Sequence, residues 1–353
     1  MEKYIQYLKE NFLTPEQYII SKFAEHQVIL LGEDHAVKSN LDLVINLIPL
    51  LYQAGIYNFG MEFGASEDQA DLDRLITDEE YDEAEERRLM FNYNVKWAYK
   101  EYTDIYKAAW KFNRSLPKDA KKFRILNLSY IYNWEGFLGM RTPISFKKIF
   151  HKGNIEAFRA NLVEREILSK GEKLLILTGT PHAFTKFKNP IFEGNADQFF
   201  ILQGGWLGNR LYEKFGSRIF NIIMHQPAMN INTLLPDTTS GIKTIEAVME
   251  SLGNKPVGFD LLNTVMGDIP DDSYNSIPYK NFTLKEMSDG YIFTKPIKKQ
   301  QGCTVNYSYL EGKNFEEVQN NWPDNDWNPI PKNEEEYWNK IEEYVDLRKR
   351  YLM

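Results

Sequence analysis

Three side chains capable of acid–base chemistry directly follow a short apolar run. Residues 28–31 are Val-Ile-Leu-Leu, and Gly32, Glu33, Asp34 and His35 come next. A carboxylate can hold an imidazole in one tautomer, so that the imidazole takes a proton from water or from a hydroxyl group. Carboxylate oxygens and imidazole nitrogens also bind divalent metal ions that activate water. The residue types at positions 33–35 therefore indicate either a general base or part of a metal site.

Two further strand ends carry matching side chains. Glu62 lies near the end of an expected strand at 57–64, and His182 follows the apolar run at 174–177. The carboxyl ends of parallel strands meet at one edge of a sheet, which is where ligands bind in α/β proteins. We therefore predict one catalytic group, or one metal site with the same four ligands, made of Glu33, His35, Glu62 and His182.

Each of these residues also has a purely structural interpretation. His35 can be a turn or helix-capping residue, His182 can be a loop side chain, and Glu62 can stabilise the N-terminal end of the next helix. His225 ends another apolar run, but no motif surrounds it. Because suitable residues occur at three separate strand ends, the pattern favours the chemical interpretation.

The elements that must position these residues are indicated by hydrophobic periodicity. Short apolar runs without polar alternation are typical of strands buried on both faces of a parallel sheet. Segments with helical spacing separate them, so the sequence predicts an α/β protein with three α/β/α layers and a mostly parallel central sheet. We expect strands at 28–31, 57–64, 123–128, 174–177, 199–202, 219–224 and 290–293.

The helical segments divide the chain further. The helix after His35 is expected to be capped by Ser39 or Asn40, and Pro49 is expected to kink it or end it early. Residues 66–113 lack a clear strand and predict a helical insertion after the second strand.

Two domains follow from this pattern. We expect residues 1–296 to form an α/β domain that contains the insertion, and residues 297–353 to form an appendage with a terminal helix. The appendage is expected to pack back on the domain or onto a second subunit, which makes a homodimer one expectation.

Composition narrows the class of protein. The chain has 353 residues, 42 basic and 50 acidic, for a net charge of -8, which argues against a general nucleic-acid or anionic-membrane binder. Its single cysteine, Cys303, cannot form an internal disulfide. No segment has the pattern of a signal peptide or a membrane span. We expect a cytoplasmic protein whose partner is a small-molecule substrate, with no nucleic-acid or membrane partner.

The order of the motifs resembles the erythromycin esterase-like, ChaN-like and TIKI/TraB superfamily. The resemblance covers roughly residues 28–296 and rests on order and spacing, because each motif is short. The motifs are Gly32–His35, Gly60–Glu62, Arg159, Leu177–Ala183, Gly204–Leu207 with Phe215–Gly216, and Ser288–Phe293.

The resemblance implies an α/β/α fold with a cleft lined by these residues. In esterase-like members the histidine matching His35 is the proposed base for water attacking an ester, supported by the residues matching Glu62 and His182. TIKI-like members are metal-dependent peptidases, and ChaN-like members bind haem. The chain departs from the pattern at Ala36, and it has Lys38 or Asn40 where esterase-like members carry an arginine.

The resulting hypothesis is a hydrolase that acts on an ester, lactone or amide through histidine-activated water, with or without a divalent metal ion. Arg159, Lys38 and Asn127 are the predicted substrate contacts. Two alternatives stay open at this stage. One is a protein that binds haem or another bulky ligand in the same cleft without turnover, and the other is an inherited but idle cleft.

Overall fold

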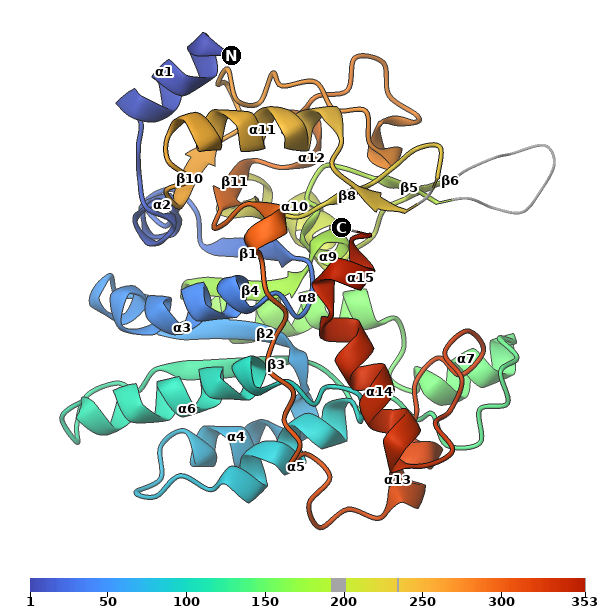
Figure 1. Cartoon of the computed structure of the whole chain (residues 1–353). Helices are drawn as coiled ribbons and strands as arrows, with labels where there is room; N and C mark the ends of the chain where they lie inside the picture. Colours follow the sequence, from blue (N-terminus) through green and yellow to red (C-terminus); the bar gives the residue numbers. More distant parts are fainter. Residues whose placement is uncertain (192–200, 234, 353) are drawn as a thin grey trace. The chain divides into compact units, whose positions relative to one another are not determined.

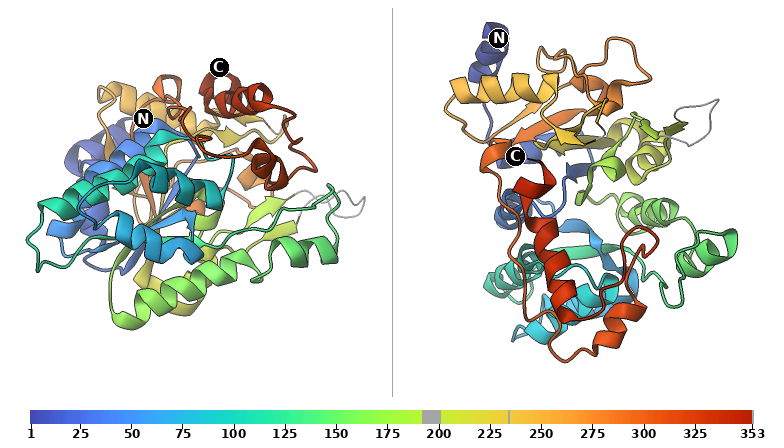
Figure 2. Two further views of the ribbon diagram at one scale, coloured as in Figure 1. Left: turned by 90° about the horizontal axis from the view of Figure 1, so that it is seen from below. Right: turned by 45° about the vertical axis from the view of Figure 1, so that its right-hand side comes forward.

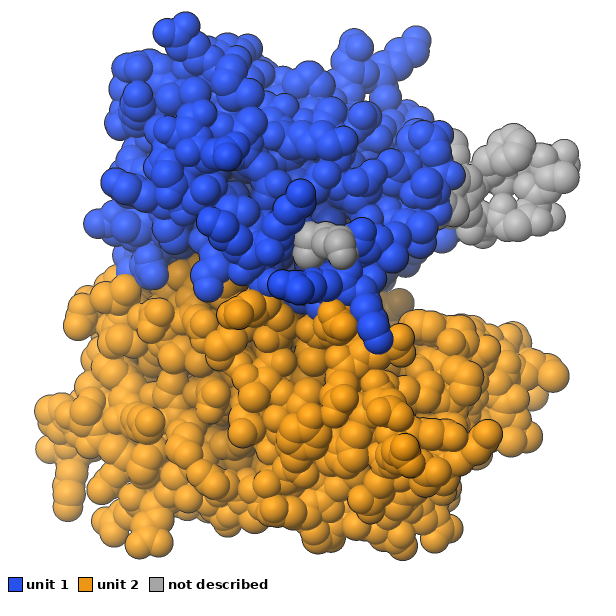
Figure 3. Space-filling view, viewed as in Figure 1, with its two compact units in different colours: residues 1–35, 175–300, 347–353 blue, residues 36–174, 301–346 orange. Residues whose placement is uncertain are grey.

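A computed structural model describes residues 1–191, 201–233 and 235–352 (Figure 1). The chain forms two units, coloured separately in Figure 3. Unit 1 comprises residues 1–35, 175–300 and 347–353, and unit 2 comprises residues 36–174 and 301–346. The main sheet has seven strands, five of them in unit 1 and two in unit 2. The predicted α/β class with a mostly parallel sheet is confirmed.

Unit 1 holds the strands that carry the predicted base. Its part of the sheet has the order β10-β11-β7-β1-β4. Strand β7 pairs in parallel with both β1 and β11, and β10 pairs antiparallel with β11. The bounds are β1 (Val28–Glu33), β4 (Leu174–Gly179), β7 (Ile219–Met224), β10 (Val257–Asp260) and β11 (Gly290–Phe293).

The helices of unit 1 are short, apart from α11. They are α1 (Glu2–Glu10), α2 (Pro15–Lys22), α9 (Thr180–Ala183), α10 (Leu207–Phe215), α11 (Ser240–Ser251), α12 (Leu284–Met287) and α15 (Leu347–Arg350), with 3-10 turns at Gly216–Arg218, Tyr274–Ser276 and Ile297–Lys299. Two small antiparallel pairs accompany them, β5 (Asn189–Ile191) with β6 (Ile201–Gln203) and β8 (Ala228–Met229) with β9 (Pro236–Asp237).

Unit 2 is mostly helical and contains the parallel strands β2 (Asn58–Ala65) and β3 (Arg124–Ser129). Helices α3 and α6 pack against each other, as both views in Figure 2 show. The helices are α3 (Lys38–Gln53), α4 (Gln69–Leu75), α5 (Glu83–Tyr93), α6 (Lys100–Ser115), α7 (Pro143–Ile149), α8 (Ile155–Glu166), α13 (Phe315–Asn320) and α14 (Glu334–Val345), with 3-10 turns at Ser66–Asp68 and Leu168–Lys170. No helix among the described residues combines the length and the apolar character that crossing a membrane requires.

Most of the expected strands form, but two expectations need correction. Strand β10 was not expected, because Gly258 and Asp260 are residue types that strands disfavour, and its pairing with β11 supplies the missing stability. In the expected strand 199–202, positions 199 and 200 lie outside the described residues. Residues 201–203 form β6, which pairs with β5 outside the main sheet.

The start of α3 also differs from the expectation. Neither Ser39 nor Asn40 caps the helix, because Val37 occupies the cap position without a side-chain hydrogen bond. The backbone N–H of Lys38 instead donates to the carbonyl oxygen of Gln301, which satisfies one donor at the helix start. The helix also continues through Pro49 to Gln53.

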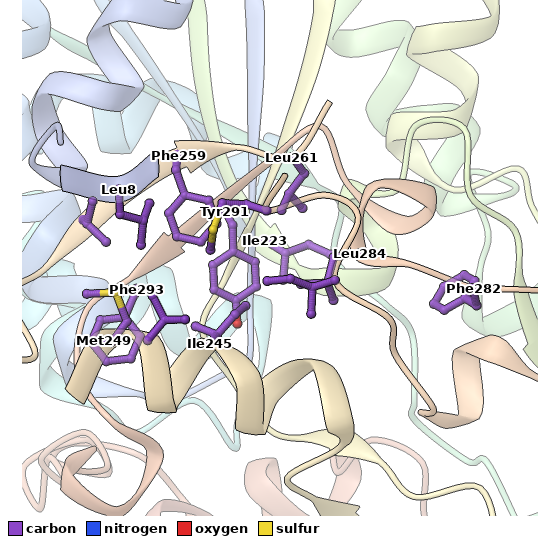
Figure 4. Packing of buried hydrophobic residues seen from close by; sticks show 14 of the residues in the cluster. Leu8, Ile223, Ile245, Met249, Phe259, Leu261, Phe282, Leu284, Tyr291 and Phe293 are labelled. Carbon is purple, nitrogen blue, oxygen red and sulfur yellow. The ribbon is translucent and has the colours of Figure 1, made fainter. Parts of the chain in front are cut away.

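A core cluster of unit 1 joins strands and helices from distant parts of the chain (Figure 4). The cluster includes Ile245 and Met249 of α11, Phe259 of β10, Phe293 of β11 and Leu8 of α1, and Met249 lies next to Phe293 in Figure 4. All five side chains are at most 2% exposed. Burial of this apolar surface holds the edge of the sheet next to β7, and thereby supports β1.

Replacing Phe293 with alanine is expected to lower the free energy of unfolding by about 3–5 kcal/mol, because Phe293 is fully buried and its removal leaves a cavity. Urea unfolding followed by circular dichroism measures the loss. The matched control is Leu138→Ala, at a side chain that is 91% exposed, for which a change within about 0.5 kcal/mol is expected. Equal losses in the two variants would contradict this account of the core.

Candidate functional site

The predicted base is held by a buried carboxylate at the end of β1. Glu33 is the last residue of β1, and its Oε1 lies 3.2 Å from Nδ1 of His35. The Glu33 side chain is 0% exposed, whereas that of His35 is 26% exposed. A carboxylate accepts a hydrogen bond, so Nδ1 of His35 carries the proton and Nε2 is the basic nitrogen. Glu33 can therefore fix both the tautomer and the orientation of the ring.

A second imidazole reaches the same place from β4. Strand β4 ends at Gly179, and α9, which contains His182, follows immediately. A Cβ atom on Gly179 would lie 3.0 Å from Nε2 of His35 and 3.4 Å from Cδ2 of His182. Both rings therefore face Gly179, and a larger residue there would displace them. Unit 1 brings together Glu33, His35 and His182.

Glycine also determines how closely α9 approaches β1. A Cβ atom on Gly32 would lie 3.1 Å from the Cα atom of Thr180 and 3.1 Å from the Cβ atom of Ala183. These distances are tighter than ordinary side-chain contacts, so a side chain at position 32 would push α9 away. On its other side, the ring of His182 packs edge-on against Trp206, with 5.1 Å between ring centroids.

The turn between Glu33 and His35 is held by the C-terminal helix of unit 1. Arg350 donates to Oδ2 of Asp34 at 2.6 Å and to the carbonyl oxygen of His35 at 2.8 Å, and the Tyr351 hydroxyl donates to the same carboxylate oxygen. Burial and the Asp34 charge raise the pKa of Tyr351, so its hydroxyl stays protonated and remains a donor. Arg350 and Tyr351 were not predicted from the sequence, because no motif marks them.

Unit 2 contains a buried ionic group around Glu62. Arg159 donates to Glu62 at 3.0 Å, to Glu156 at 3.0 Å and to the hydroxyl of Ser129 at 2.9 Å. The Arg159 side chain is 2% exposed and that of Glu62 is 8% exposed. Burial opposes the charge of Arg159, but the carboxylates of Glu62 and Glu156 outweigh it and raise the pKa of Arg159. The guanidinium therefore stays charged and holds Glu62 in place.

Two buried tyrosines of unit 2, Tyr93 and Tyr132, have raised pKa values. Burial raises the pKa of Tyr132 to about 12, and it also raises that of Tyr93. Both tyrosines line a cavity of about 250 Å³ in unit 2, together with Trp134. Their hydroxyl groups stay protonated near neutral pH, so they can donate hydrogen bonds there.

The remaining predicted substrate contacts have partners within unit 2. Lys38 Nζ lies 2.5 Å from Oε1 of Glu101, and the side-chain amide of Asn127 donates to the carbonyl oxygen of Ala65 at 2.9 Å. The Asn127 residue is 2% exposed. Roles for Lys38, Asn127 and Arg159 in binding substrate stay predictions.

A metal site requires several ligand side chains close together. In the described part of the chain, no three side chains of His, Cys, Asp or Glu are grouped as a metal ion would require. The described side chains thus offer no ready fit to a resident ion.

Comparison with solved structures identifies the fold. No family model matches the chain, and no curated protein matches it. A mutant of the erythromycin esterase EreC in its open conformation is 11% identical, and the match covers 78% of this chain and 91% of that one with a TM-score of 0.52. The chain has an erythromycin esterase-like fold. The resemblance found in the sequence is thus confirmed for the fold, and identity this low shows the fold alone.

Other solved structures align more loosely. ChaN of Campylobacter jejuni, solved with cofacial haem, is 18% identical, and the match covers 58% of this chain and 84% of that one with a TM-score of 0.30. A structure titled as bacterial protein toxins is 13% identical over 62% of this chain, with a TM-score of 0.38. This chain spans only 39% of the toxin's length.

His225 directly follows β7 and forms a buried hydrogen-bond network with Tyr291 and Glu246. Its Nδ1 lies 2.7 Å from the Tyr291 hydroxyl and its Nε2 lies 3.3 Å from Oε1 of Glu246. Burial lowers the pKa of His225, although Glu246 opposes the shift. The folded protein therefore binds the proton of His225 less readily than the unfolded chain does.

The pH dependence of stability follows from this shift. The contribution of neutral His225 is fully present above the unfolded pKa of about 6.5 and is lost as the pH falls below it, by at most about 1.4 kcal/mol per pH unit. We expect His225→Gln to remove this loss between about pH 6.5 and pH 5, as measured by urea unfolding at each pH. His151→Gln, at an exposed position, should leave the slope unchanged. A wild-type slope in His225→Gln would show that another group titrates.

Removing the cation of the buried ionic group is expected to be costly. Arg159→Met leaves Glu62 and Glu156 buried without their common partner and should lower the free energy of unfolding by about 3–5 kcal/mol. Arg165→Met on the same helix, where the arginine side chain is 68% exposed, should change it by less than about 1 kcal/mol. Chemical denaturation of both variants tests this, and similar stabilities for the two would refute it.

Proposed function

We propose that the protein is a hydrolase that acts on an ester, lactone or amide, with His35 as the general base. The observation that carries the proposal is the pairing of His35 Nδ1 with the fully buried Glu33 carboxylate at 3.2 Å. It makes Nε2 the basic nitrogen and directs it toward Gly179, at the end of β4. The erythromycin esterase-like fold supports the choice of reaction class.

The reaction begins when Nε2 of His35 takes a proton from water while the water oxygen bonds to the carbonyl carbon. The carbonyl π electrons move to the oxygen, which becomes an oxyanion. When the carbonyl re-forms, the bond from carbon to the leaving oxygen or nitrogen breaks, and the imidazolium returns its proton to the leaving group. Glu33 stabilises the imidazolium during the interval, because its negative charge is buried against the ring.

His182 is proposed to stabilise the oxyanion. Its ring faces Gly179 together with His35 and is held from the other side by Trp206. A hydrogen-bond donor at this position is most effective where charge develops in the transition state. The participation of Glu62 and Arg159 in the same reaction stays a prediction.

The proposal predicts a graded loss of activity. With a panel of p-nitrophenyl esters, His35→Asn should lower kcat/KM by about 10²–10⁴-fold because it removes the base. Glu33→Gln should lower it by about 10–100-fold because it weakens the orientation and charge of the ring. Initial rates measured spectrophotometrically on the folded variants provide the test.

Two controls keep the result interpretable. His151→Asn changes an exposed histidine and should retain wild-type rates, while circular dichroism confirms that each variant is folded. Undiminished hydrolysis by folded His35→Asn would contradict the assignment of the base. A Soret band on titration with haem, combined with no turnover of any ester, would favour ligand binding instead.

A further inference from the structure

A cavity of about 280 Å³ in unit 1 opens beside the helix that carries His182. Thr180 and Pro181 of α9 form one wall, and Thr180 Oγ1 donates to Oε1 of Gln226 at 3.0 Å on the same wall. Thr180 also packs through its Cα against Gly32, the residue before Glu33. We call this space the α9 cavity. The short helix α9 therefore lines the cavity and also packs against β1 next to Glu33.

The α9 cavity has mainly apolar walls. They include Phe184, Ile223, Ile242, Leu284, Met287 and Tyr291. Asp271 is the one charged residue among the described lining residues, which include no lysine, arginine or histidine. The electrostatic character of the space therefore disfavours an anionic guest.

Asp271 has hydrogen-bond donors but no cationic partner among the described residues. It is 6% exposed, its Oδ1 accepts from the Thr239 hydroxyl at 2.6 Å, and its Oδ2 accepts from the backbone N–H of Ser273 at 3.2 Å. In the described part of the chain no basic side chain forms an ion pair with it. Each carboxylate oxygen can accept more than one hydrogen bond, so the group has acceptor capacity left. A buried carboxylate gains most from a cation that pairs with it.

We propose that the α9 cavity binds an apolar group that carries an amino function, and that this group is part of the substrate. The ammonium would pair with Asp271, while the carbon skeleton would lie against the apolar walls. A volume of about 280 Å³ corresponds to about nine water volumes, which limits the guest to a small group. The assignment to the substrate rests on the proposed hydrolase function, whereas the binding itself does not.

Binding is tested with three probes of similar size and different charge, namely benzylamine, benzyl alcohol and benzoate. Ligand-observed NMR titration of the full chain gives the affinities without any turnover. Benzylamine should bind at least about tenfold more tightly than benzoate, with benzyl alcohol between them. Equal affinities, preference for benzoate, or no binding of any probe would overturn the proposal.

Two neighbouring aspartates provide a matched pair of variants. Asp271→Asn should abolish the preference for benzylamine and keep the binding of benzyl alcohol. Asp272→Asn should keep the preference, because Asp272 accepts from the backbone N–H of Ser240 at the start of α11 but does not line the cavity. Urea unfolding verifies that both variants are folded. Loss of the preference in Asp272→Asn alone, or in both variants equally, would contradict the role of Asp271.

The position of the guest is tested with a second pair. Met229 lines the cavity and is 45% exposed, so Met229→Trp should fill the entrance and weaken benzylamine binding by about tenfold or more. Leu235 is 47% exposed and is not a lining residue, so Leu235→Trp should leave the affinity unchanged. Equal affinities in the two variants would place the guest elsewhere.

The link to hydrolysis is tested separately. Benzylamine should inhibit ester hydrolysis competitively in the wild type and not in Asp271→Asn. Binding of benzylamine without inhibition would overturn the assignment of the cavity to the substrate while leaving the His35 mechanism intact. Conversely, if the protein hydrolysed no ester, the measured binding of benzylamine would still stand.

Discussion

The hydrogen bond between the Glu33 carboxylate and the His35 imidazole depends on complete burial of the carboxylate. A buried charge that loses its hydrogen bonds costs free energy, so the Glu33 carboxylate stays hydrogen-bonded to its neighbours. The surrounding structure maintains this burial. Strand β1 is an interior strand of the sheet, next to the apolar strand β7. At the end of β1, Gly32 and Gly179 let α9 and both imidazole rings come close.

Asp34 is constrained in a different way. Its carboxylate accepts from Arg350 and Tyr351, which come from the far end of the chain. The three consecutive residues Glu33, Asp34 and His35 therefore serve different ends. Glu33 pairs with the ring of His35, and Asp34 anchors the turn. In the proposed reaction His35 accepts a proton from water. In unit 2, the carboxylate of Glu62 accepts a hydrogen bond from Arg159, and this pairing raises the pKa of Arg159.

The strand bounds and helix caps were predicted from local sequence patterns, and the predictions were correct where the pattern was strong. The strands 219–224 and 290–293 were predicted with their observed bounds, because both are short, mainly apolar segments rich in strand-forming residues. Strand β10 was missed because its four residues include Gly258 and Asp260, and only its partner β11 makes it a strand. The cap of α3 was wrongly assigned to Ser39 or Asn40 because a backbone contact with Gln301 replaces the side-chain cap.

By itself, the sequence determined the α/β class and the residue types at the strand ends, because hydrophobic periodicity and the order of short motifs are local properties of the chain. It also singled out Glu33, His35 and His182. Only the tertiary structure decided that Gly179 brings the two rings together, that Arg350 and Tyr351 hold Asp34, and that Asp271 lines a cavity beside α9. These contacts join residues far apart along the chain, and no local pattern encodes which of many polar side chains will meet after folding.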